Sequence, residues 1–292
     1  QHEYSKNMKI KVTATQFESI KGDKEANINK ALHLSKLAVT QKTNVILLQE
    51  LFQTEYFCST KSSKFFDYAI SFPENRIFET FSNFCKNYEI VMPISFFEKH
   101  ENNYFNSLVV INSKGEISDV YRKSHIPEGP GYNEKFYFTP GNTGFKVFET
   151  VYGKIGCGIC WDQWFPECAR TMTLMGADVL LYPTAIGSEP QDPLIKSKLH
   201  WQNVMIGHSA ANQIPVIASN RIGEETEEDV SLSFYGGSFI TDHLGNITKE
   251  MDGKTEGVIT NEFDLDLIKQ YRQSWGNFRD RRPDLYKKIC DF

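Results

Sequence analysis

The chain has 292 residues, of which 40% are hydrophobic and 24% charged, a composition typical of globular proteins and unlike that of disordered, collagen-like or small disulfide-rich chains. Its formal net charge is −5, with 32 Lys and Arg against 37 Asp and Glu, so the sequence offers no basic stripe for a nucleic-acid backbone. The longest apolar runs are far shorter than the roughly 20 residues that a membrane-spanning helix requires.

Strand-like and helix-like segments alternate along the N-terminal third of the chain. In chain order, hydrophobic periodicity predicts a strand over 9–17, a helix over 26–41, a strand over 45–48, a helix over 77–88 and a strand over 90–97. The run over 45–48 is apolar throughout, which is typical of a strand covered on both faces. A hairpin is expected next, because residues 107–111 lead through the polar turn 112–115 into a strand that ends near Arg122.

The alternation continues in the second half of the chain. Buried strands are predicted over 154–159, 178–182 and 215–218, and helices over 166–175 and 194–211. A second hairpin is expected from 237–241 through the turn 242–245 into 246–250. We expect a solvated loop, and not a metal site, from the acidic cluster Glu224, Glu225, Glu227, Glu228 and Asp229.

The chain carries no linker rich in Ser, Gly or Pro, so one layered α/β domain is predicted over residues 8–292. The polar residues 1–7, which precede Met8, have no apolar signal-peptide core and are expected to be a tag or an extension. Six cysteines in a chain of this length favour reduced thiols and therefore a cytoplasmic protein.

Cys160 lies between the predicted strand 154–159 and a helix that opens at Pro166. A thiol on such a turn is expected to be exposed at the edge of the sheet and to feel the helix N-terminus, which favours the nucleophilic thiolate. The alternatives are a buried structural cysteine and, from the Cys157-x-x-Cys160 spacing, a redox or zinc site. The zinc alternative lacks the second pair of ligands that such sites require.

Two charged residues also follow predicted strands, Glu50 after 45–48 and Lys123 after the hairpin strand. Strand ends are where reactive groups converge in α/β folds. A carboxylate that takes the thiol proton and an ammonium that stabilises an oxyanion would complete a nucleophilic device with Cys160. Taken singly, both residues are more often solvated charges, and rival bases are available in His125, His200 and His208.

The segments around these three residues, 49–52, 121–127 and 158–167, resemble the Glu-Lys-Cys triad motifs of the nitrilase, or carbon–nitrogen hydrolase, superfamily. Three motifs in this order are a highly specific combination, and the resemblance extends over residues 8–292. It implies a four-layer αββα sandwich that needs no metal or organic cofactor. It also implies homo-oligomers built from dimers, with a C-terminal arm of about residues 270–292 in the subunit contacts.

Within the superfamily, residues 50–58, 129–138, 182–190 and 218–223 are most similar to the members that hydrolyse N-carbamoylputrescine to putrescine, ammonia and carbon dioxide. By that likeness Cys160 is the nucleophile, Glu50 the base and Glu134 a second catalytic glutamate. Lys123 and the backbone N–H of Trp161 would hold the oxyanion. Tyr132 and Glu189 would face the distal amine. One departure is Gln49, which stands where relatives usually have Pro.

The charge of the substrate can be argued in part from the residues themselves. The five residues after Cys160 contain no cation, and Glu189 and Asp192 follow the strand 178–182, so an acidic rim suits a ureido substrate with a distal ammonium. The alternative is another amidase or a carbamoyl-β-alanine hydrolase, in which Arg221 or Arg279 from a distant loop binds a carboxylate. A catalytically inactive scaffold of the same fold is a further alternative, which intact Glu50, Lys123 and Cys160 argue against.

Overall fold

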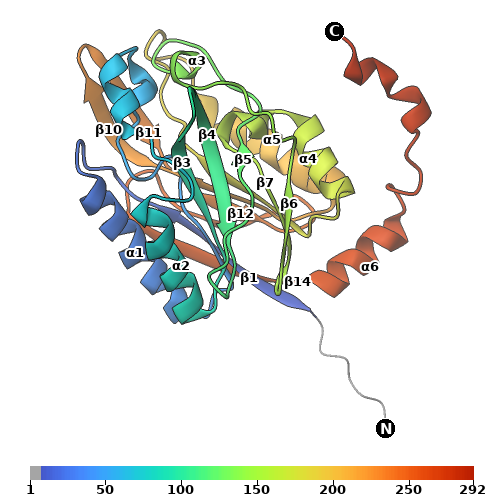
Figure 1. Cartoon of the computed structure of the whole chain (residues 1–292). Coiled ribbons are helices and arrows are strands. Elements are labelled where there is room, and N and C mark those ends of the chain that lie inside the picture. Colours follow the sequence, from blue (N-terminus) through green and yellow to red (C-terminus); the bar gives the residue numbers. More distant parts are fainter. Residues whose placement is uncertain (1–7) are drawn as a thin grey trace.

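The chain folds into four layers, two helical layers with two β-sheets between them (Figure 1). A computed structural model describes residues 8–292, so the predicted tag or extension over 1–7 lies outside the described part. Helices α1 (Lys24–Thr40) and α2 (Arg76–Tyr88) cover one sheet. Helices α4 (Pro166–Leu174) and α5 (Ser197–Asn212) cover the other. The predicted αββα sandwich is confirmed.

The first sheet is assembled from two three-stranded pieces. One has the order β14 (Gly257–Asp264), β1 (Lys9–Gln16), β2 (Val45–Leu47), and the other β3 (Met92–His100), β4 (Asn103–Ile111), β5 (Tyr121–Arg122). The pieces join where the Val91 N–H donates to the Asn44 carbonyl at 2.8 Å and the Ile46 N–H donates to the Val91 carbonyl at 3.0 Å. This join places the end of β2, and thus Glu50, near the middle of the sheet.

The second sheet is six-stranded, in the order β13 (Ile247–Glu250), β12 (Phe239–Thr241), β9 (Val216–Asn220), β8 (Val179–Thr184), β7 (Gly153–Cys157), β6 (Val147–Thr150). Strands β7, β8 and β9 run parallel to one another. Because parallel strands end at the same edge, the residues that follow β7 and β8 meet there.

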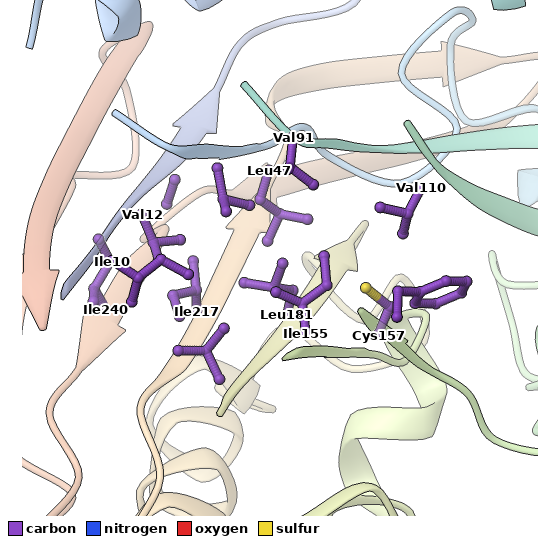
Figure 2. Packing of buried hydrophobic residues seen from close by; sticks show 14 of the residues in the cluster. Ile10, Val12, Leu47, Val91, Val110, Ile155, Cys157, Leu181, Ile217 and Ile240 are labelled. Carbon is purple, nitrogen blue, oxygen red and sulfur yellow. The ribbon is translucent and has the colours of Figure 1, made fainter. Parts of the chain in front are cut away.

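The main core lies between the two sheets, as Figure 2 shows. Ile10 and Val12 from β1 face Ile217 and Ile240 across this layer, and Leu47 and Val91 lie over Leu181 and Ile155. Strand β2 supplies both faces, because Val45 and Leu47 belong to the inter-sheet core while Ile46 packs under the outer helices α1 and α2. The prediction that the apolar run over 45–48 is a strand covered on both faces is therefore confirmed.

The prediction of a solvated acidic loop is wrong for three of its five residues, because Glu224, Glu225 and Glu227 lie in a strand, and two of these three are paired with cations. Residues 222–235 form a hairpin of β10 (Ile222–Glu227) and β11 (Val230–Tyr235), with Glu228 and Asp229 in its turn. Glu227 lies 2.7 Å from Lys21 Nζ and 2.8 Å from Lys64 Nζ, and Glu225 pairs with Arg221 at 3.0 Å. Glu227 is neutralised by two lysines that lie far away in the sequence, and Glu225 by Arg221, which the prediction had considered only as a ligand for a substrate carboxylate.

The chain ends in α6 (Leu265–Trp275) and a segment with two short 3₁₀ turns, Pro283–Leu285 and Lys287–Cys290. Strands β6 and β14 and helix α6 were not predicted, because these segments are only partly buried and rich in polar residues. In Figure 1 the segment after α6 is shown in red; it runs on the side of α4 and α5, where Asn277 Nδ2 donates to the Ala211 carbonyl at 3.1 Å. In residues 8–292 no helix is long and apolar enough to cross a membrane.

Candidate active site

The ends of strands from both sheets meet at one place. The Glu50 N–H donates to the Thr184 carbonyl at the end of β8 at 3.4 Å, and Ser219 Oγ of β9 donates to the Leu47 carbonyl of β2 at 2.8 Å. Lys123 follows β5, and its N–H donates to the Asn106 carbonyl of β4 at 2.8 Å. The two sheets therefore bring Glu50 and Lys123 to the same end of the sandwich.

Three charged side chains form a buried cluster there. Lys123 Nζ donates to Glu134 Oε1 at 2.7 Å and lies 3.5 Å from Glu50 Oε1, with all three side chains at most 2% exposed. Tyr56 OH donates to Glu134 Oε2 at 2.7 Å, and Asn106 Nδ2 donates to Glu50 Oε1 at 3.3 Å. Glu134, the first residue of the short helix α3 (Glu134–Tyr137), and Glu50, which lies after β2, thus share the ammonium of Lys123.

The cluster shifts the pKa values of Glu50 and Lys123. Burial raises the pKa of Glu50 to about 7, against the opposing effect of the Lys123 charge, and the negative charge of Glu134 adds to the rise. Burial alone would lower the pKa of Lys123, but the carboxylates of Glu134 and Glu50 outweigh it and hold that pKa above its ordinary value. The site therefore pairs a permanent cation with a carboxyl group that titrates near neutral pH, which suits a general base.

Cys160 lies beside this cluster, at the start of the 3₁₀ turn η3 (Cys160–Trp164). Its φ of +38° is in the left-handed region, which residues with a Cβ rarely adopt and which occurs preferentially at active sites. The Sγ atom lies 3.7 Å from the Ala185 carbonyl and 3.9 Å from Gln163 Nε2. The strained turn after β7 thus holds the thiol beside the cluster, and the charges of Glu50, Lys123 and Glu134 all influence the pKa of this thiol.

The prediction of an exposed thiolate is wrong. Cys160 is 7% exposed, and α4 begins only at Pro166, so the turn η3 separates the thiol from the N-terminus of that helix. Burial raises the pKa of Cys160 well above its ordinary value, the Glu50 charge adds to the rise, and Lys123 opposes it. The resting thiol is therefore protonated and requires a base, and Glu50 has a suitable pKa.

The rival bases are engaged elsewhere. His125 Nδ1 lies 2.7 Å from Asp162 Oδ1, and its ring stacks on Phe165 with the centroids 3.7 Å apart. His208 Nε2 lies 2.6 Å from the Gln163 carbonyl, and His200 meets the ring of Trp164 edge-on. No histidine hydrogen-bonds Cys160 Sγ anywhere in residues 8–292.

The alternative metal or redox site also has no structural basis. Cys157 is fully buried in the inter-sheet core, among the apolar side chains of Figure 2. Within the described residues, no group of three or more His, Cys, Asp or Glu side chains is arranged to hold a metal ion. The Cys-x-x-Cys spacing therefore results from one core residue at the end of β7 and one site residue after it.

The two arginines considered for a substrate carboxylate have other roles. Arg221 is fully buried and donates to the backbone carbonyls of Glu50 at 3.0 Å and Leu51 at 3.1 Å. Its other nitrogen pairs with Glu225 at 3.0 Å, so Arg221 clamps the turn that carries Glu50. Arg279 lies in the C-terminal segment, where it pairs with Asp280 at 2.8 Å and its side chain is 73% exposed.

The predicted substrate contacts lie on loops next to Cys160. Tyr132 OH donates to the Ser188 carbonyl at 2.9 Å and accepts from the Gly187 N–H at 3.1 Å. Burial raises the pKa of Tyr132, and the charges of Glu189 and Cys160 add to it, so the three groups share one environment. Glu189 is half-buried, and burial raises its pKa. Trp161, at 37% exposure, is the second residue of η3, a position whose N–H has no partner within the turn.

Sequence reasoning missed Tyr56, Asn106 and Tyr235 at this site, and it considered Arg221 only as a ligand for a substrate carboxylate. Tyr56 and Arg221 hold the glutamates and their turn, and Tyr235, whose pKa is raised by burial and by Cys160 and Glu189, lies on the same side as Tyr132. Asn106 had a usable signal, because it and Ser107 place polar side chains, both fully buried, in strand β4 between Phe105 and the apolar run 108–111. A polar residue in the middle of a buried strand indicates a specific partner.

Comparison with known proteins agrees with this geometry. The family model described as carbon-nitrogen hydrolase matches residues 11–273. An N-carbamoylputrescine amidase from Oryza sativa is 50% identical over 96% of this chain and 94% of its own length. A citrullinase from Francisella tularensis is 49% identical over 90% and 94%, respectively. The crystal structure of a carbon-nitrogen hydrolase from Helicobacter pylori superposes with a TM-score of 0.90 at 38% identity, covering 97% of this chain and 99% of that one. The chain belongs to the carbon-nitrogen hydrolase family.

Proposed function

We propose that the protein hydrolyses N-carbamoylputrescine to putrescine, ammonia and carbon dioxide. The observation that carries this proposal is the buried Glu50–Lys123–Glu134 cluster beside the thiol of Cys160. Relatives about half identical over nearly the whole chain bear the name N-carbamoylputrescine amidase, which supports the substrate.

The first half of the reaction forms an S-carbamoyl enzyme. Glu50 takes the proton of Cys160, and Sγ attacks the ureido carbon. The carbonyl oxygen becomes an oxyanion, which Lys123 Nζ and the N–H of Trp161 stabilise. As the intermediate collapses, the C–N bond to the terminal amino group breaks, and the proton held by Glu50 passes to that nitrogen, so ammonia leaves.

The second half releases the carbamoyl group. Glu50, again ionised, takes a proton from a water that attacks the thiocarbamate carbon. The C–S bond then breaks, and the proton held by Glu50 returns to Sγ to restore the thiol. Glu134 orders that water and keeps Lys123 in place through their 2.7 Å contact. The carbamate that forms breaks down to the amine and carbon dioxide.

The distal ammonium of the substrate is assigned to the half-buried Glu189 with Tyr132. A carboxylate that is removed from bulk water attracts a cation strongly, and the phenol keeps its oxygen fixed between Gly187 and Ser188. Citrulline carries the same ureido group plus a carboxylate, and the citrullinase relative makes it a second candidate. The engagement of Arg221 with Glu225 and backbone carbonyls favours the substrate without a carboxylate.

The test is ammonia and amine release from N-carbamoylputrescine, citrulline, N-carbamoyl-β-alanine and a short aliphatic amide, with Cys160→Ala as the blank. We expect putrescine from the first substrate only with the intact thiol, and a raised KM for it in Glu189→Gln. Preference for N-carbamoyl-β-alanine, which has a carboxylate and no ammonium, would keep the cysteine chemistry and refute the assignment of Glu189. Preference for citrulline would refute N-carbamoylputrescine as the substrate. Inactivity on all four substrates would refute the proposed function.

We also propose that copies of this chain associate through the C-terminal arm. A groove of about 900 Å³ lies between α4, α5 and the arm, lined by apolar side chains such as Leu174 and Ile289. The side chains of Leu285 and Ile289 are 65% and 62% exposed, which favours their burial against a second copy. Light scattering should give a mass above that of one chain, and Ile289→Asp should lower it. From its cysteine content we place the protein in the cytoplasm, which cell fractionation can test.

A further inference from the structure

One buried carboxylate joins the two loops that carry Cys160 and Lys123. Asp162 has no exposed surface and accepts four hydrogen bonds. Its Oδ1 accepts from the backbone N–H of His125 at 3.0 Å and from the ring Nδ1 of His125 at 2.7 Å. Its Oδ2 accepts from Tyr121 OH at 2.5 Å and from the Ile159 N–H at 3.0 Å. Both oxygens are therefore saturated with donors, as a buried carboxylate requires.

The donors flank the two reactive residues. Tyr121 and His125 lie two positions before and two positions after Lys123, and Ile159 directly precedes Cys160. The ring of His125 also stacks on Phe165, just beyond the turn that holds the thiol. Any displacement of Asp162 would therefore move the ammonium loop and the thiol turn relative to each other.

The backbone at Cys160 needs such a restraint. Its positive φ is unfavourable for a residue with a Cβ and persists only when the surroundings hold it. The hydrogen bond from the Ile159 N–H to Asp162 Oδ2, together with that from the Asp162 N–H to the Ile159 carbonyl at 3.0 Å, closes the turn on both sides of Cys160. The same carboxylate thus fixes the strained turn and ties it to the loop of Lys123.

We propose that Asp162 is a positioning residue that fixes the Lys123 ammonium relative to the Cys160 thiol. This inference rests on the catalytic roles proposed above for Cys160 and Lys123. An asparagine fills the same space but has only one acceptor oxygen. Its NH₂ group would replace the Oδ2 that accepts from the Ile159 N–H, so two donors would face each other there. The Asp162→Asn variant therefore keeps the volume of the side chain and breaks the join.

The first measurement is the rate of Cys160 alkylation by iodoacetamide, made in a Cys290→Ser background because Cys290 is exposed. Lys123 stabilises the thiolate, so a displaced ammonium slows alkylation, by about 10- to 100-fold for a misplacement near 1 Å. Asp178→Asn is the matched control. Asp178 is also a buried carboxylate, it accepts from the Lys154 N–H at 2.8 Å, and it precedes β8, whose other end meets Glu50. Its alkylation rate should stay within about twofold of the parent rate, since distant sites act independently.

The second measurement is kcat per alkylatable site, together with KM. Positioning predicts a fall in kcat with KM nearly unchanged. A purely structural role predicts fewer native sites, each with the parent kcat and alkylation rate, and that result would overturn the proposal. If Asp162→Asn does not fold, Tyr121→Phe removes one of the four bonds and should slow alkylation by a smaller factor, whereas an unchanged rate would overturn the proposal. Alkylation needs no substrate, so it tests Asp162 even if N-carbamoylputrescine proves to be the wrong substrate.

Discussion

The amide of Asn106 should help set the pH below which kcat/KM falls because Glu50 becomes protonated, which is the acid limb of the pH profile. Its Nδ2 donates to Glu50 Oε1 at 3.3 Å, and that bond favours the ionised form of a carboxyl group whose pKa is about 7. Asn106→Leu keeps the side-chain shape and removes the donor. A hydrogen bond to a charged group contributes about 1.5–3 kcal/mol, and the long distance favours the lower figure. Since 1.36 kcal/mol corresponds to one unit, the acid limb of kcat/KM should move upward by about one pH unit.

The assay is ammonia release across the pH range of about 5.5 to about 9.5, which extends about 1.5 units below the wild-type limb and about 1.5 units above the shifted limb. At pH 7 the variant should lose about fivefold in kcat/KM, and most of this loss should be recovered above the new limb. Asn212→Leu is the matched control, because Asn212 is also a buried amide with one donated bond and an unpaired oxygen. An acid limb that stays in place in Asn106→Leu, or moves equally in Asn212→Leu, would refute Glu50 as the base.

Three further substitutions test the structure. Glu50→Gln should abolish activity. Its stability relative to wild type should rise as pH rises from 4.5 to about 7, because the raised pKa of Glu50 means that ionisation of this group opposes folding in that window. A stability difference between variant and wild type that is the same at about pH 5 and about pH 8 would contradict this. Gln49→Ala should cost about 1–3 kcal/mol in urea unfolding, since Gln49 bonds the Phe17 N–H and carbonyl, both at 3.1 Å. Arg221→Lys should cost about 3 kcal/mol or more because it leaves buried acceptors unpaired, and a loss below about 1 kcal/mol would refute the clamp.

Much of the scaffold was predictable from local pattern. The continuous apolar run at β2 and the helical periods of α1, α2, α4 and α5 gave the layers, because burial of one face imposes a period on the sequence. The motifs around Glu50, Lys123 and Cys160 indicated the family, and the family match confirms it. The segments β6, β14 and α6 were not predicted, because they are only partly buried and rich in polar residues.

The sequence by itself determined which residues carry the chemistry, and the tertiary structure decided their state. Cys160 looked like an exposed thiolate because neighbouring residues along the chain say nothing of burial, which is set by the loops of both sheets. Glu227 looked solvated because its cations, Lys21 and Lys64, become its neighbours only in the folded protein. Protonation and charge pairing depend on desolvation and on distances through space, and neither quantity is written in the order of the residues.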